Sequence, residues 1–205
     1  MEDLQGTGMP ETSQRTVNNQ LLVSPALPAI QVQVTPSLRY TGEPLCFTLY
    51  ESAEVEIFLF VEQQKGKIQR MLKFHFESLL PHVQQTYSGM TGPTIQFGQS
   101  VYATSTELVN LASGLAQRPN SDTVQVLGFL GEKGLKIEPE VMVCRFSRII
   151  GEDQRSAFLI SYFEDISNIE IPSMELTLNT GGNPWERTGK QVQKRALTSF
   201  TIKEG

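Results

Sequence analysis

Cysteine and histidine are scarce in this chain of 205 residues, which holds two of each. Cys46 and Cys144 lie far apart, each in an apolar run typical of a strand, so we expect free buried thiols and no disulfide. With only His75 and His82 available, one chain cannot supply a three-histidine zinc site. We expect neither a metal nor a cofactor.

Long apolar runs are missing as well. No stretch approaches the ~20 apolar residues that span a bilayer, and the first residues lack the basic start and apolar core of a signal peptide. The sequence has no Cys-x-x-Cys pair and no Asn-x-Ser/Thr glycosylation site. These absences predict a soluble protein of the reducing cytoplasm, with no membrane partner.

The motifs of common catalytic sites are also lacking. The sequence has no Gly-x-Ser-x-Gly elbow, and no pattern that brings a cysteine near a histidine. The run Thr188–Gln191 ends like a phosphate-binding loop, but Gln191 stands where the hydroxyl that holds magnesium is required. Whether the protein is an enzyme is left open by these residues.

Charge is unevenly distributed along the chain. The net charge of −5 argues against a general nucleic-acid partner. Residues 183–205, however, carry five basic and two acidic side chains, a local charge of +3. Asn183 and Pro184 can begin a helix here, and its spacing places apolar and basic residues on opposite faces. We therefore predict a basic amphipathic helix over about residues 184–200, suited to an acidic body or partner.

The N-terminal residues 1–20 differ in composition from the rest of the chain. They are polar, without periodicity, and hold almost no large apolar residues, which predicts a disordered arm. Residues 21–205 are then long enough to form one domain with its own core. Near its start, the alternation in Ile30–Val34 predicts a short or edge strand, half buried and bounded by prolines.

Two long hairpins are the strongest structural signals. The first joins Val55–Glu62 to a second arm beginning at Ile68, through a polar break in which Gly66 supplies the positive φ of the turn. The second joins Val141–Ile150 to Arg155–Ile166. Both hairpins have arms rich in β-branched and aromatic residues, as antiparallel strands require.

Alternation on the second arm of the first hairpin predicts which side chains face the core. Even-numbered positions from Ile68 to Phe76 are apolar except for Arg70, whereas odd-numbered positions are polar except for Met71. The even face therefore packs on a core, and the odd face meets water or a second layer. His75 belongs to the odd face, and we expect it in contact with solvent.

Helices are predicted between and after the hairpins. Thr104–Glu107 has the form of a capping box, and leucines follow at helical spacing to Leu115. Ser121 and Asp122 can begin another helix that Gly134 would end, with a strand over residues 124–130 as the alternative. The segment Pro81–Tyr102 is predicted to be irregular.

Together these elements predict an α+β fold. We expect a curved, mainly antiparallel sheet of about five to seven strands, with two or three helices packed on one face. Curved sheets of this kind often enclose an apolar ligand cavity, which is an analogy between folds and assigns no residues.

Three charges occupy faces of the hairpins that are otherwise apolar: Arg70, Arg145 and Glu164. Because an unpaired buried charge costs several kcal/mol, each needs an ion pair, a hydrogen bond or access to water. They can pair with one another as a structural network, or they can form a polar spot within an apolar pocket. The residue pattern leaves both interpretations open.

Two classes of function follow from these alternatives. The first is a small-molecule binding protein with an apolar pocket, such as an isomerase or a cyclase, whose partner is a small apolar molecule. Its candidate pocket residues are Arg70, His75, Tyr87, Arg145, Tyr162 and Glu164. The alternative is a non-enzymatic protein-interaction module that uses the basic C-terminal helix. Either class is compatible with a homo-oligomer.

Overall fold

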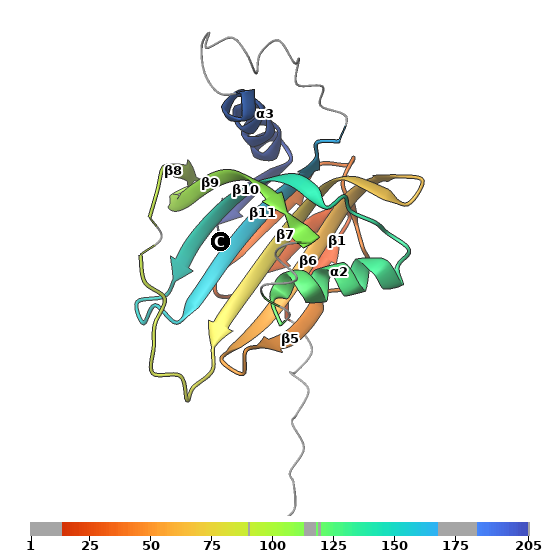
Figure 1. Ribbon diagram of the computed structural model, residues 1–205. Helices are drawn as coiled ribbons and strands as arrows, with labels where there is room; N and C mark the ends of the chain where they lie inside the picture. The colour runs from red at the N-terminus through yellow and green to blue at the C-terminus, as the bar shows by residue number, and fades with distance from the viewer. Residues whose placement is uncertain (1–13, 90, 113–117, 119, 168–183, 205) are drawn as a thin grey trace, which may run out of the picture.

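A computed structural model describes residues 14–89, 91–112, 118, 120–167 and 184–204 (Figure 1). The fold is mostly β, with 52% of residues in strands and 16% in helices. Two antiparallel sheets form, and neither is curled or closed. The predicted α+β class and curved sheet are therefore wrong. The strands divide between two layers, and one predicted helix is part of a strand.

The smaller sheet has four strands, in the order β1-β2-β3-β12. Its strands are β1 (Thr16–Asn18), β2 (Leu21–Ser24), β3 (Ile30–Val34) and β12 (Phe200–Glu204). The predicted strand at Ile30–Val34 is confirmed, with alternate residues buried. Pairing of β12 with β3 brings the end of the chain onto the sheet formed by its beginning.

The larger sheet has eight strands, in the order β4-β6-β7-β11-β10-β9-β8, with β5 also pairing with β6. Its strands are β4 (Arg39–Tyr40), β5 (Leu45–Leu49), β6 (Ala53–Gln64), β7 (Lys67–Leu79), β8 (Thr94–Phe97), β9 (Ser100–Asn110), β10 (Glu140–Ile150) and β11 (Ser156–Asp165). Both predicted hairpins are present, as β6–β7 and β10–β11, and they lie side by side at the centre of the sheet.

The main core lies between the two sheets, which face each other (Figure 1). Aliphatic residues of the small sheet pack against aromatic rings of the large one. Phe58, Phe74 and Phe146 are almost fully buried there, and Phe200 of β12 contacts the rings of both Phe74 and Phe146. Burial of each such ring contributes about 1.5–3 kcal/mol, so this aromatic layer holds the sheets together.

Helix α2 (Asp122–Glu132) covers part of the opposite face of the large sheet (Figure 1). Val126 and Leu130 of the helix are buried in a second apolar cluster with residues of β6, β7, β10 and β11. Strand β6 is therefore buried on both faces, which explains its continuous apolar run. The helix ends where predicted, because Gly134 adopts φ +70° just beyond it.

Helix α3 (Pro184–Thr198) lies beside β9 and β10 on the face of the large sheet opposite α2 (Figure 1). It begins at Pro184, as predicted, and joins β12 after a short turn. Val192 and Ala196 are buried in the main core, so this helix is fixed by its apolar face. The side chain of Trp185, near the start of this helix, lies outside the described residues.

The predicted helix over residues 104–115 is wrong over Thr104–Asn110, whereas Leu111 and Ala112 are helical. Thr104–Asn110 belong to strand β9 and pair with β10 in continuous register. The β-branched residues of this segment, Thr104, Thr106 and Val109, favour a strand, and the neighbouring hairpin supplies the partner. The same strand, together with β8, replaces part of the irregular segment predicted over Pro81–Tyr102.

The predicted arm over residues 1–20 extends too far into the chain, since Thr16–Asn18 form β1. Arg15 anchors this end to the large sheet. Its guanidinium lies 2.6 Å from the Glu56 carboxylate on β6 and stacks over the ring of Phe76. The arm residues 1–13 lie outside the described part of the chain.

A bulge in the first hairpin changes which face one residue occupies. Glu62 opposes Arg70, but Gln63 opposes Ile68, so Gln69 has no partner on β6. Ile68 therefore packs in the cluster under α2, whereas Arg70 remains on the face of the main core. The predicted common face of Ile68 and Arg70 is wrong for this reason. The rest of the predicted even-numbered face is in the main core.

Candidate functional site

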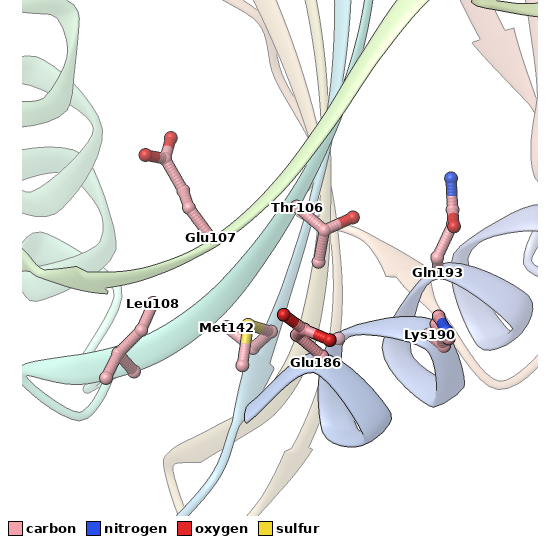
Figure 2. Close-up of a pocket in the computed structure, with 8 residues that line it drawn as sticks. Thr106, Glu107, Leu108, Met142, Glu186, Lys190 and Gln193 are labelled. Carbon is pink, nitrogen blue, oxygen red and sulfur yellow. The ribbon is translucent and has the colours of Figure 1, made fainter. Parts of the chain in front are cut away.

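A groove with a volume of about 340 Å³ lies between α3 and the ends of β9 and β10 (Figure 2). It is open to solvent along its length. Its lining residues are Thr106, Glu107, Leu108, Met142, Glu186, Gly189, Lys190 and Gln193. None of the six residues predicted to line a pocket is among them.

The helical wall of the groove approaches β9 closely at Gly189. A Cβ atom at this position would lie 3.4 Å from the Thr106 methyl group, in close van der Waals contact with the strand. Figure 2 shows Lys190 and Gln193 along the helix beside Thr106. Lys190 and Glu186 are exposed and one helical turn apart, so the wall offers a charge of each sign.

The other wall of the groove is the outer edge of β9. Strand β8 pairs with only the first four residues of β9, and Thr104 then donates its backbone N–H to Pro93 O at 2.8 Å. Because backbone groups alternate along a strand, Thr106 and Leu108 also direct their N–H and C=O groups to this edge. Among the residues that the structure describes, no strand pairs with them there.

The side chains along this edge are divided between the two faces of the sheet. Leu108 lies on the α3 side opposite Met142, and 43% of its surface is exposed. Glu107 points away from Thr106, as Figure 2 shows, and forms an ion pair with Arg145 of β10. Burial lowers the pKa of the Arg145 guanidinium, which nevertheless stays charged at neutral pH. The acidic charge nearest the strand edge is thus largely neutralised.

Three of the predicted pocket residues meet one another in a different place, on the main-core face. Arg70 pairs with Glu62, and the Tyr162 hydroxyl donates to Glu164 Oε2 at 2.9 Å. Arg195 of α3 binds both oxygens of Glu164, at 2.7 and 2.9 Å. Burial and the Glu164 carboxylate raise the pKa of Tyr162, so its hydroxyl remains a donor. We call these five residues the α3 network, because they tie α3 to the large sheet.

Two further predicted residues, His75 and Tyr87, belong to a cluster on the α2 face. His75 Nε2 lies 3.0 Å from Glu77 Oε2, and His75 Nδ1 lies 3.3 Å from Asp122 Oδ2. Asp122 also binds Lys73 Nζ at 2.5 Å, and the Tyr87 hydroxyl donates to Glu77 Oε1 at 2.5 Å. The predicted exposure of His75 is wrong: 3% of its surface is accessible. We call these five residues the α2 cluster.

Electrostatics explain how the α2 cluster tolerates burial. Burial alone would raise the pKa of Asp122, but contacts with His75 and Lys73 outweigh it and hold that pKa well below its usual range. The pKa of Glu77 is lowered in the same way, through His75 and Tyr87. Both ring nitrogens of His75 are buried next to carboxylate oxygens, but neither makes a hydrogen bond of good geometry.

Arg145, the third misplaced charge, lies on the α2 face and does not join Arg70 and Glu164. Adjacent positions on β10 and β11 explain this, because Arg145 opposes Ser161, whose neighbours Tyr162 and Ile160 point to the other face. The three charges are therefore paired separately, each with a partner of its own: Glu62, Glu107 and Arg195.

Comparisons with protein-family models, curated proteins and solved structures find no match for this chain. The site must therefore be interpreted from its own residues. Within the described residues, no group of three histidine, cysteine or carboxylate side chains is arranged to hold a metal ion. No described helix is long and apolar enough to cross a membrane. Cys144 is buried as predicted, but Cys46 is exposed.

Sequence patterns alone miss Asp122 and the strand side of the groove. They indicate Asp122 only as a helix-capping residue, yet Ser121 is the N-cap residue and makes no side-chain cap bond. Asp122 instead turns its carboxylate toward the sheet. The groove is missed because the predicted helix includes Thr106 and Leu108. The local signal against that helix is the run of β-branched residues ahead of Leu108.

Proposed function

We propose that this protein is a non-enzymatic interaction module and that its partner binds in the groove between α3 and β9. One observation carries the proposal: the groove joins a strand edge, at which no strand of the described residues pairs, to a charged helix face. Thr106 and Leu108 offer backbone groups on one side, and Lys190 offers an exposed cation on the other. Backbone groups on a free edge favour association with another chain.

The alternative of a small-molecule pocket gains less from these residues. A pocket for a small ligand surrounds most of its surface with apolar side chains and a few convergent polar groups. The groove is open, and polar or charged side chains form much of its lining. Arg70, Tyr162 and Glu164 already bind one another or neighbouring residues, and so do His75 and Tyr87. These side chains support packing of the helices more directly than ligand binding.

Peptide selection tests the proposal and does not require the partner to be identified first. A phage-displayed library of random peptides, about twelve residues long to span a strand edge, is selected on the immobilised protein. Enriched peptides are then synthesised and their dissociation constants measured by fluorescence anisotropy. We expect Lys190→Glu to change the affinity of most of these peptides by about tenfold, because it reverses the charge beside the strand edge.

Lys203→Glu is the matched control. Lys203 is exposed on β12, in the other sheet, so the same charge reversal is made away from the groove. A selection that yields no binding peptide would contradict the proposed function. So would peptides whose affinity changes equally in the Lys190→Glu and Lys203→Glu proteins, since they would be responding to net charge alone.

A further inference from the structure

We infer that the groove takes an acidic, extended peptide segment, which adds a strand to the large sheet along the outer edge of β9. The incoming strand would continue the position of β8. That strand occupies the edge beside Ser100–Ala103 and leaves Thr106 and Leu108 available within the described structure. Strand addition rests on the groove being a partner-binding surface, as proposed above.

Backbone geometry determines the form of the occupant. The N–H and C=O groups of Thr106 and Leu108 repeat every second residue along the edge, about 7 Å apart. Only an extended chain presents donors and acceptors at this interval, so neither a helix nor a compact ligand can satisfy both residues. The existing bond from Thr104 to Pro93 O, at 2.8 Å, shows that the edge already binds an extended chain immediately upstream.

Side chains along the groove determine the chemistry of the occupant. Alternate residues of the added strand would face α3, between Leu108 on the strand and the exposed side chains of the helix. Leu108 is 43% exposed and favours an apolar or β-branched neighbour. The exposed face of α3 carries Lys190 and Lys194 one turn apart, against Glu186 at one end. Because Glu107 is paired with Arg145, the remaining charge favours an acidic segment.

A proline substitution separates backbone pairing from side-chain contact. Leu108→Pro removes the N–H on the outer edge, whereas the bonds to β10 are made by the flanking odd-numbered residues and remain. Leu108→Ala removes the side chain but keeps the N–H. The probe is a fluorescein-labelled octapeptide whose residues facing α3 alternate between valine and glutamate, with threonine at the positions between them. In its charge control, lysine replaces each glutamate.

We expect the acidic peptide to bind, and the lysine peptide to bind at least about tenfold more weakly. Leu108→Pro should lower the affinity for the acidic peptide by about tenfold, and Leu108→Ala by about threefold or less. Amide hydrogen exchange gives a second measurement in the unmodified protein. Peptide addition should slow exchange at Thr106 and Leu108, and leave Glu107, whose amide already faces β10, little changed.

The outcomes distinguish the two proposals. If library peptides bind at the groove but the acidic octapeptide does not bind at millimolar concentration, strand addition by an acidic segment is wrong while the interaction function stands. Equal effects of Leu108→Pro and Leu108→Ala, without slowed exchange at Thr106 and Leu108, lead to the same conclusion. If Lys190→Glu leaves the binding of every peptide unchanged, the groove is not the binding surface and both proposals fail. Should Leu108→Pro not fold, hydrogen exchange in the unmodified protein decides alone.

Discussion

Strand β7 carries one polar network on each of its faces, and the two differ in burial. On the main-core face, the α3 network includes Arg70 and Arg195, whose side chains are 30% and 37% exposed. On the opposite face, the α2 cluster includes His75 and Lys73, with side chains 4% and 10% exposed. Water can reach the remaining charges of the α3 network if one member is removed, but it cannot reach those of the α2 cluster.

This difference determines what each network contributes. An ion pair with access to water contributes little, because the charges are already well solvated and the pair must order two long side chains. A buried pair is also a weak source of stability, but removing one partner leaves an uncompensated charge in an apolar surrounding. We therefore expect similar ionic contacts to have unequal energetic consequences on the two faces of β7.

The largest effect is expected from Asp122→Asn in the α2 cluster. The substitution keeps the shape of the side chain but leaves Lys73 and His75 without their shared carboxylate. We expect a loss of about 3 kcal/mol in the free energy of unfolding, measured by urea denaturation. Glu132→Gln, at the exposed end of the same helix, is the control and should change stability by less than about 0.5 kcal/mol. Equal values for the two variants would show that the cluster is effectively solvated.

Acid should reproduce part of that loss in the unmodified protein. The pKa values of Asp122 and Glu77 lie below their usual range when the protein is folded. The unfolded chain therefore binds protons at higher pH than the folded one, and stability is lost as the pH falls below about 4. We expect the difference in urea midpoint between the unmodified protein and Asp122→Asn to shrink between pH 7 and about pH 3.5. A constant difference would contradict the ionic role of Asp122.

The sequence predicts well which neighbouring segments pair as hairpins, and poorly which elements pack on the faces of the sheet. The α3 network and the α2 cluster show why. Both hairpins form because Gly66 and the turn beginning at Gly151 lie between arms of strand composition. Alternation correctly separates Arg70 from His75 onto opposite faces. It cannot reveal that α2, far along the chain, covers His75, because that contact depends on the packing of layers.

Pairing with a distant strand also explains why the predicted helix is wrong over Thr104–Asn110. Leucines at helical spacing and a capping-box pattern favour a helix locally, but β10 offers a continuous ladder of backbone partners. Of the predicted pocket residues, alternation identifies Arg70 and Glu164 as misplaced charges but not their partners. Arg195 comes from α3, and nothing in the sequence near Glu164 indicates where that helix will lie.

In the α3 network, Glu164→Gln should cost about 1 kcal/mol. Arg195 loses its charged partner, but it is 37% exposed and can be hydrated. Tyr162 keeps an acceptor in the amide oxygen. Urea denaturation measures the change in the free energy of unfolding. Arg195→Met, which removes the other member of the ion pair, is the matched variant. A loss as large as that of Asp122→Asn would mean that burial does not distinguish the two networks.

Tyr87→Phe tests the rim of the α2 cluster. The phenol donates to Glu77 at 2.5 Å, and burial together with this carboxylate raises the Tyr87 pKa, so the group is a neutral donor at all ordinary pH values. Removing it should cost about 0.5–1 kcal/mol, since Glu77 keeps its contact with His75. Thermal unfolding followed by circular dichroism is sufficient to detect this. An unchanged midpoint would show that the segment bearing Tyr87 is held by its backbone bond to Gln154 alone.

Arg145→Met should have the smallest effect, although its ion pair with Glu107 resembles the others in geometry. Glu107 is 52% exposed and is readily hydrated when its partner is removed. Burial lowers the pKa of Arg145, which means that its charge is held in an unfavourable environment, and methionine retains the apolar part of the side chain. Loss of the ion pair and relief of desolvation should therefore nearly cancel, leaving a change within about 0.5 kcal/mol in urea denaturation. A cost of several kcal/mol would show that Arg145 resembles the buried α2 cluster. Removing one member of an ion pair is that costly only when the remaining member has no access to water.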